Sequence, residues 1–212
     1  MKIIAIIPAH LNSIRFPRKI LFPIFNLPMI EHVRRRAIIS QVFDDVIVAT
    51  CDEEISNLIK DNKGKVLMTS NKHTNGTTRV AEAILSTDCT HVVLLQGDEP
   101  LILPKHLKLF YKKISSNPNV CSWNGTGIIE KKEDLDRHSF VKCIISNNEN
   151  IVKCFRYFSK LSKSEKKEKN IKKILGIIAY KRDFLINISN KNISINEKNE
   201  LIEQMRIIDN NF

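Results

Sequence analysis

The chain has 212 residues, of which 42% are hydrophobic and 27% charged, so it is long enough to bury a core and has the composition of a globular protein. No stretch approaches the roughly 20 apolar residues of a membrane span, and the five cysteines are scattered without a CxxC spacing. These properties argue against a membrane protein and against a disulfide or zinc framework. They predict reduced thiols in the cytoplasm.

The net charge of +11 is unevenly distributed along the chain. Seven lysines and two glutamates lie in the run from Lys160 to Lys173, which carries nearly half of the excess positive charge. Binding of nucleic acid would favour arginine and aromatic residues among the lysines, and this run contains neither. We therefore expect a solvated loop or a frayed helix there.

The first predicted element is a strand over residues 2–7, an apolar run that is too short for a signal peptide. The loop over residues 8–19 follows and places a serine and three cations at the carboxyl end of this strand: Ser13, Arg15, Arg18 and Lys19. Clustered cations suit a polyanionic ligand such as a triphosphate, although a merely basic loop would have the same composition. The loop contains neither a P-loop motif nor a GxGxxG fingerprint.

Two helix–strand pairs come next. The apolar spacing and the position of Pro28 predict a helix over residues 28–39, followed by a strand over residues 45–49. Asp52-Glu53-Glu54 then opens a helix, and we interpret these acidic residues as capping residues because they suit the positive end of the helix dipole. A short strand is predicted over residues 65–68.

A polar segment, residues 73–79, precedes the following helix. It supplies backbone N–H groups, hydroxyls and an arginine at the start of a helix whose apolar stripe includes Val80, Ala81 and Ile84. Such a segment can bind an anion or a ribose phosphate, although an ordinary capped helix would begin in the same way.

The stretch from Leu94 to Pro100 is the most informative part of the sequence. It ends a strand, His91 to Leu95, whose continuous β-branched pattern is typical of strands buried on both faces of a parallel sheet. Ligands bind at the carboxyl ends of such strands, which is where Asp98 and Glu99 lie. An acidic surface turn is the alternative interpretation of these two residues.

In the second half of the chain, the predicted helices and strands alternate less regularly. We expect helices and strands over the following ranges: helix 104–115, strands 120–129, 140–145 and 174–180, helix 182–188 and helix 197–208. Strands that alternate with helices favour an α/β sheet, here partly mixed in its second half. No linker is long enough to divide the chain, so we expect a single domain over residues 1–212.

Five ordered blocks together resemble the CMP-KDO synthetase (3-deoxy-manno-octulosonate cytidylyltransferase) family. They are Ile7-Pro8-Ala9-His10 with Ser13, Arg15, Pro17 and Lys19; His73, Asn75, Gly76, Thr77, Arg79, Ala81 and Glu82; Gln96 to Pro100; Leu175 to Arg182; and Glu200, Ile202, Glu203, Gln204, Met205 and Arg206. The blocks span nearly the whole chain, so they are more specific together than any one of them.

The resemblance implies a single-domain Rossmann-like mixed sheet of the nucleotide-diphospho-sugar transferase type. It also implies a cytoplasmic homodimer that serves lipopolysaccharide biosynthesis and has neither nucleic acid nor membrane as a partner. In the implied reaction, the anomeric hydroxyl of an acidic sugar attacks the α-phosphorus of CTP and releases pyrophosphate. The triphosphate repels nucleophiles, so cations must neutralise its charge while both substrates are held in line.

The resemblance also implies roles for individual residues. Asp98 would bind Mg²⁺, and Arg15 and Lys19 would hold the β- and γ-phosphates and stabilise the leaving pyrophosphate. The nucleotide-binding residues would be Pro8, Ala9, His10, Ser13, Arg15, Lys19, His73, Asn75, Gly76 and Arg79. The residues that face the sugar acid would be Gln96, Glu203 and Gln204, while Glu99 would be a structural part of its turn.

The sequence departs from the family pattern at three points. His10 stands where the family has an arginine, which removes a permanent charge and a bidentate donor. Ile174 and Ile178 replace a histidine and an aromatic residue expected near the sugar, so a nonulosonate or an 8-amino derivative of KDO stays open as the substrate. The family's V-D-T-x-x-D segment, whose aspartate completes the metal site, is absent before Phe212.

Two carboxylates bind Mg²⁺ more strongly than one, so this third departure predicts weak metal binding, a ligand supplied by a partner, or little turnover. The main interpretation is an active synthetase that makes a CMP-linked acidic sugar. The alternatives are a divergent or truncated relative that binds nucleotide with little turnover, and a basic protein without enzymatic activity.

Overall fold

The computed structural model describes residues 1–13, 16–168 and 170–212. Its internal contacts divide the chain into two compact units, which we call the first unit (residues 1–123 and 176–189) and the second unit (residues 124–175 and 190–212). The expectation of one domain over residues 1–212 stays a prediction.

The first unit is built on a mostly parallel sheet. Strands β1 (Ile3–Ala9), β4 (Asp45–Thr50), β5 (Lys65–Met68) and β6 (His91–Leu95) run parallel in the order β5-β4-β1-β6. The last part of β10 (Ile171–Lys181) pairs antiparallel with β6. Every residue of β1 and β6 is buried, which explains their continuous apolar sequences. The expected α/β class with a mixed sheet is confirmed.

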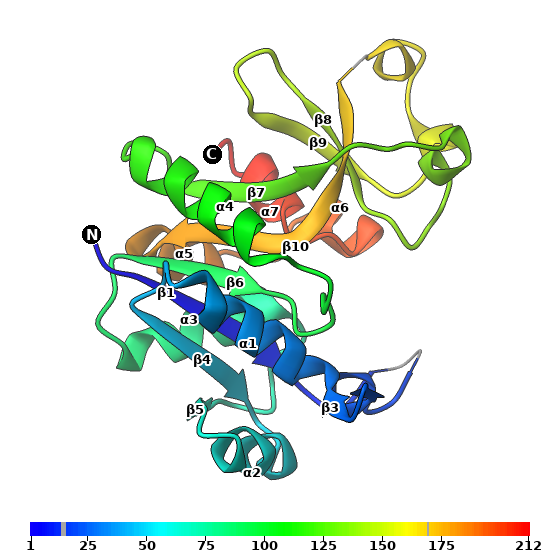
Figure 1. The fold of residues 1–212 in the computed structure, drawn as a ribbon. Helices are drawn as coiled ribbons and strands as arrows, with labels where there is room; N and C mark the ends of the chain where they lie inside the picture. The colour runs from blue at the N-terminus through cyan, green and yellow to red at the C-terminus, as the bar shows by residue number, and fades with distance from the viewer. Residues whose placement is uncertain (14–15, 169) are drawn as a thin grey trace. The chain divides into compact units, whose positions relative to one another are not determined.

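Helices cover both faces of this sheet (Figure 1). Helix α1 (Met29–Ser40) packs against α4 (Pro104–Ser116) in front of the sheet, and α3 (Gly76–Ala83) packs against α5 (Arg182–Ser189) behind it. Helix α2 (Glu53–Asp61) packs against β4 and β5. A short hairpin of β2 (Pro23–Ile24) and β3 (Leu27–Pro28) lies between the first loop and α1.

The second unit has short strands and short helices. The first part of β10 pairs antiparallel with β8 (Lys142–Ile145), which pairs antiparallel with β9 (Ile151–Phe155), and β7 (Ser122–Gly127) also pairs with β10. Helices α6 (Ile195–Glu200) and α7 (Met205–Asp209) pack against each other, and α7 also packs against β9. A small core joins these elements through Cys143, Cys154, Ile202 and Met205.

The predicted helix over residues 197–208 is wrong as one continuous element. Helix α6 ends at Glu200, Leu201 adopts a left-handed conformation with φ of 54°, and α7 begins at Met205. The physical reason lies in Arg156, whose guanidinium donates to the carbonyls of Glu200 (2.8 Å) and Leu201 (3.0 Å). These side-chain donors take the place of amides in a continued helix, so the chain can turn here.

The lysine run differs from its expected state in one part. Strand β10 begins at Ile171, so Lys172 and Lys173 lie in a sheet, while two short 3₁₀ turns, Phe158–Lys160 and Glu165–Lys167, include Lys160, Lys166 and Lys167. Strand β9 was not expected from the sequence, because its residues do not alternate clearly between apolar and polar. Helices 28–39, 104–115 and 182–188 are confirmed to within a residue at each end.

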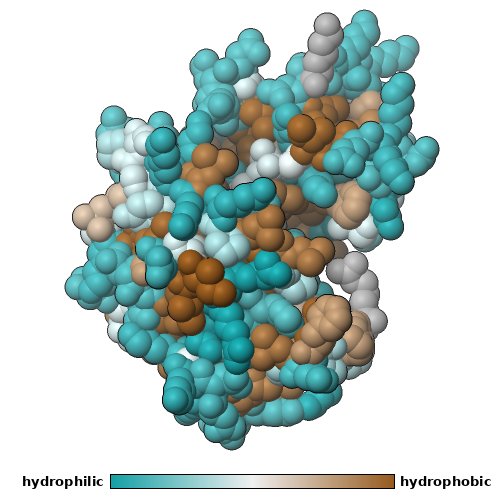
Figure 2. Space-filling model, viewed as in Figure 1, coloured by the Kyte–Doolittle hydropathy of each residue, from teal (hydrophilic) through white to brown (hydrophobic). Residues whose placement is uncertain are grey.

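The surface in Figure 2 is mainly hydrophilic, with apolar patches of limited size between the polar side chains. In the part of the chain that the structure describes, every helix is too short or too polar to cross a membrane.

Candidate functional site

In the first unit, two loops that are far apart in sequence meet at the carboxyl edge of the sheet. Lys19 follows β1, Asp98 follows β6, and their side chains form an ion pair between Nζ and Oδ2. Both side chains keep contact with solvent, at 29% and 38% exposure. The structure thus places these two predicted residues together, within reach of a ligand. The predicted Arg15 lies outside the described residues.

In the loop after β1, the described residues 10–13 and 16–22 are held together at the peptide of Leu11. The Leu11 carbonyl accepts from the amides of Ser13 (2.9 Å) and Arg18 (3.0 Å), and the Leu11 amide donates to Asp52 Oδ2 (3.0 Å). The guanidinium of Arg18 pairs with Glu54. The first turn of α2 therefore contacts this loop at two points. The loop in turn carries Ser13 and ends at Lys19.

This geometry corrects the interpretation of Asp52 as a capping side chain. Asp52 occupies the N-cap position of α2, but its carboxylate makes no capping hydrogen bond and instead reaches the amide of Leu11. A pattern of acidic residues before a helix cannot distinguish these two outcomes, because the distant partner is not visible in the local sequence.

The start of α3 lies against the end of β1. Asn75 caps this helix, since its Oδ1 accepts from the amide of Thr78 at 2.9 Å. A Cβ atom on Gly76 would lie 3.1 Å from Pro8 Cγ and 3.8 Å from Gln96 Nε2. The absence of a side chain at Gly76 thus lets the helix approach both residues. Pro8, Gly76 and Gln96 form one wall of the edge.

The remaining predicted residues of this segment bind protein partners. His73 Nδ1 lies 3.1 Å from Thr78 Oγ1, and His73 Nε2 is hydrogen-bonded to Glu82. Arg79 is buried and donates through Nη1 to Thr69 Oγ1 (2.6 Å) and to the Ser70 carbonyl (3.2 Å). The bond from His73 is the main cause that lowers the pKa of Glu82. These residues therefore hold the segment before α3 in shape.

The turn after β6 packs on a glycine of β10. The amide of Gln96 donates to the carbonyl of Gly176 at 2.9 Å. A Cβ atom on Gly176 would lie 2.6 Å from Glu99 Cγ and 2.9 Å from two carbons of Gln96. Glycine is therefore required here for the close approach, and it fixes the turn that carries Asp98. This role of Gly176 was not predicted from the sequence.

Two residues predicted to face the sugar, Glu203 and Gln204, belong to the second unit, in the connection between α6 and α7. Gln204 Nε2 donates to Asn124 Oδ1 at 3.4 Å. Two cations hold the connection: the partly buried Arg156 binds the carbonyls of Glu200 and Leu201, and the fully buried Lys142 donates to the carbonyl of Arg156.

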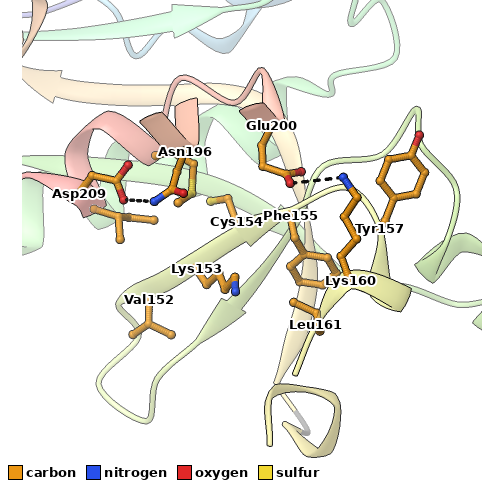
Figure 3. Close-up of a pocket in the computed structure, with 12 residues that line it drawn as sticks. Val152, Lys153, Cys154, Phe155, Tyr157, Lys160, Leu161, Asn196, Glu200 and Asp209 are labelled. Atoms are coloured by element: carbon orange, nitrogen blue, oxygen red, sulfur yellow. Dashed lines mark hydrogen bonds and ion pairs between the residues drawn. The ribbon is translucent and has the colours of Figure 1, made fainter. Parts of the chain in front are cut away.

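The second unit also contains a pocket of about 350 Å³ between β9, α6 and α7 (Figure 3). Its rim carries two polar pairs, Lys160 with Glu200 (3.9 Å) and Asn196 with Asp209 (2.9 Å). The described residues among those predicted for the site do not line this pocket. The pocket therefore shares no lining residue with the candidate site at Lys19 and Asp98.

The donor set at the edge of the first unit bears on metal binding. Within residues 1–13, 16–168 and 170–212, no three His, Cys, Asp or Glu side chains come together as a metal cluster. Asp98 offers a single, partly exposed carboxylate. This set fits Mg²⁺, which binds commonly through one or two carboxylates together with the oxygens of a phosphate substrate.

Comparisons with known proteins match almost the whole chain. A family model described as cytidylyltransferase matches residues 4–211. A 3-deoxy-manno-octulosonate cytidylyltransferase of Solibacter usitatus is 30% identical over 100% of this chain and 84% of its own length. An 8-amino-3,8-dideoxy-manno-octulosonate cytidylyltransferase of Shewanella woodyi is 34% identical over 99% of this chain and 86% of its own length.

Solved structures give the same result. A CMP:2-keto-3-deoxy-manno-octonic acid synthetase complexed with CTP superposes with a TM-score of 0.90 at 30% identity, over 99% of this chain and 86% of that one. A cytidylyltransferase of Leptospira borgpetersenii, at 18% identity and a TM-score of 0.66, covers 100% of this chain and 74% of that one and shares the fold.

Proposed function

The chain belongs to the cytidylyltransferase family, and from this premise we propose that it transfers CMP from CTP to 3-deoxy-manno-octulosonate (KDO) with release of pyrophosphate. It is a CTP-dependent enzyme of the nucleotide-diphospho-sugar transferase fold. Its product serves lipopolysaccharide biosynthesis, as the name of the sugar implies.

The observation that carries this proposal is the meeting of Lys19 and Asp98 at the carboxyl edge of a parallel sheet. A cation and a carboxylate on separate loops are the groups that a metal-bound triphosphate requires: one for phosphate oxygens and one for the metal. In the protein alone the two groups neutralise each other. When CTP binds, the Lys19 ammonium turns to the β- and γ-phosphates and then stabilises the charge that develops on pyrophosphate.

We propose Mg²⁺ as the cofactor, held by the Asp98 carboxylate together with oxygens of the triphosphate. The ion would neutralise phosphate charge and polarise the phosphoryl group when bound. Lys19, and Arg15 in the same loop, would add positive charge on the side of the leaving group. The sugar hydroxyl would then attack the α-phosphorus in line with that leaving group.

The other predicted residues complete the two substrate sites. Ser13, His73, Asn75, Gly76 and Arg79 would line the nucleotide with Pro8, Ala9 and His10. Gly76 supports this role most directly, because its missing side chain lets the start of α3 lie close to Pro8 and Gln96 at this edge of the sheet. Gln96, Glu203 and Gln204 would hydrogen-bond the hydroxyls of the sugar acid.

A second candidate substrate is the 8-amino derivative of KDO. Relatives named for that sugar match this chain at 33% and 34% identity, which equals or exceeds the identity to relatives named for KDO. The isoleucines at 174 and 178 also change the polarity expected next to the sugar. We further propose a homodimer in the cytoplasm, where a reducing environment suits the five free cysteines.

The test is release of pyrophosphate over a panel of acidic sugars and the four ribonucleoside triphosphates, with and without Mg²⁺. We expect release with CTP, Mg²⁺ and KDO, and none with ATP or without the sugar. Faster release with the 8-amino sugar would identify the second candidate. Binding of CTP without release, for every sugar and metal concentration, would contradict turnover and leave a nucleotide-binding relative.

A further inference from the structure

The first turn of α2 makes contacts that the reaction described above does not use. The N-cap residue Asp52 and the first-turn residues Glu53 and Glu54 are acidic, and Asp52 and Glu54 contact the loop after β1. Asp52 Oδ2 accepts the amide of Leu11 at 3.0 Å, and Cys51 Sγ lies 3.7 Å from the same oxygen. Asp52 is partly buried, so this hydrogen bond is partly shielded from competing water.

The hydrogen bond between Asp52 and Leu11 affects several residues, because the Leu11 peptide makes further contacts within the loop. The Leu11 carbonyl accepts the amides of both Ser13 and Arg18, so the two ends of the loop close on one peptide unit. Lys19 directly follows Arg18 and pairs with Asp98. A displacement of the Leu11 peptide would therefore move the proposed phosphate-binding residues at both ends of the loop.

The contact of Glu54 with Arg18 is weaker support. Both side chains are about half exposed, and exposed ion pairs contribute little because water and salt screen them. Glu53 is exposed, and among the residues that the structure describes its side chain has no hydrogen-bond or ion-pair partner. It lies in the same helical turn and carries the same charge as Asp52, which makes it a matched control.

We infer that Asp52 is a positioning residue that, through the amide of Leu11, holds Ser13 at one end of the loop after β1 and Arg18 and Lys19 at the other end in their triphosphate-binding positions. This inference rests on the proposed function for its effect on CTP. The carboxylate acts here as a hydrogen-bond acceptor for a backbone amide, not as a ligand of the metal. Asparagine, which keeps an acceptor oxygen of the same reach, should therefore replace it, and alanine should not.

The experiment compares Asp52→Ala, Asp52→Asn and the control Glu53→Ala. In Asp52→Ala we expect faster hydrogen exchange at the Leu11 amide and an increase of about tenfold in the KM for CTP, the effect of losing a hydrogen bond to a charged acceptor. The KM for the sugar acid should stay unchanged. Asp52→Asn should keep most of the wild-type protection and affinity, and Glu53→Ala should match the wild type.

Three results would overturn the inference. The first is unchanged hydrogen exchange at the Leu11 amide in Asp52→Ala. The second is an equal loss of exchange protection and of affinity for CTP in Asp52→Asn and Asp52→Ala. The third is an equal rise in the KM for CTP and for the sugar acid in Asp52→Ala. Equal loss in the two variants would indicate that the negative charge matters, as for a metal ligand. The exchange measurement requires no turnover, so a wild-type protein that releases no pyrophosphate would contradict the proposed function while Leu11 still reports on Asp52.

Discussion

The first unit and the second unit hold their candidate substrate residues by different physical means. In the first unit, side chains at the ends of buried parallel strands contact one another, as Lys19 does with Asp98. In the second unit, cationic side chains bind backbone carbonyls, as Arg156 and Lys142 do around the connection that carries Glu203 and Gln204. The first arrangement leaves charges free to exchange partners with a ligand, whereas the second fixes the course of the chain.

From this difference between the two units, we expect the largest effect on activity from a substitution of Asp98 in the first unit. Asp98→Asn keeps the size of the side chain but removes the negative charge, so we expect turnover to fall by about a hundredfold to a thousandfold. The thermal midpoint should change little, because the side chain is partly exposed. Pyrophosphate release and thermal unfolding measure the two effects.

Asp88→Asn is the matched control for that substitution. Asp88 is an exposed aspartate of the same unit that pairs with Lys2 before β6, away from the candidate site in the chain. It should retain wild-type turnover. Equal activity of Asp98→Asn and Asp88→Asn would refute the metal assignment.

A methyl group at Gly176 should affect both stability and catalysis in the first unit. The new Cβ would lie 2.6 Å from Glu99 Cγ, so Gly176→Ala must displace the turn that carries Asp98, at a cost of about 1–3 kcal/mol. Urea unfolding and kcat would both report this. At Gly127 of the second unit, the nearest atom is the flexible end of Lys173 at 3.2 Å, so Gly127→Ala should be tolerated. Equal effects of the two substitutions would contradict the packing argument.

In the second unit, we expect substitutions to change the stability of the fold. Lys142→Met leaves the carbonyls of Arg137 and Arg156 without the buried ammonium, and we expect a loss of about 2 kcal/mol in the free energy of unfolding. Lys163→Met, at an exposed lysine, is the control and should have no measurable effect. Urea denaturation gives both values. An unchanged midpoint for Lys142→Met would show that water replaces the ammonium.

A smaller effect is expected from His91, which is buried at the start of β6 beside Trp123. Burial lowers the pKa of His91 below its ordinary value of 6.5, and the charge of Lys181 adds to this. The unfolded chain therefore binds a proton at a higher pH than the folded chain. The contribution of neutral His91 to the free energy of unfolding should be fully present above about pH 6.5 and should decrease as the pH falls below this value.

Comparing denaturation curves between pH 7.5 and pH 5 tests this sign. The side chain in His91→Phe cannot bind a proton. The free energy of unfolding of this variant should therefore decrease less between pH 7.5 and pH 5 than that of the wild type. The same pH dependence in both proteins would show that other groups are responsible.

The sequence predicts the first unit better than the second for a physical reason. Strands β1 and β6 are buried on both faces, so their apolar runs are visible locally, and the residues that follow them must lie at one edge of the sheet. The break at Leu201 depends on Arg156, which lies 45 residues earlier. The role of Asp52 likewise depends on Leu11, 41 residues away. No local pattern contains these partners.

The most direct test of the account is a double-mutant cycle between Lys19 and Asp98, measured as kcat/KM for CTP in pyrophosphate release. The variants are Lys19→Met, Asp98→Asn and the two combined. Residues that act as a unit on one triphosphate give non-additive losses, so the double variant should be about as slow as the slower single variant. If the two losses multiply instead, Lys19 and Asp98 act independently, and the shared site at this edge of the sheet is contradicted.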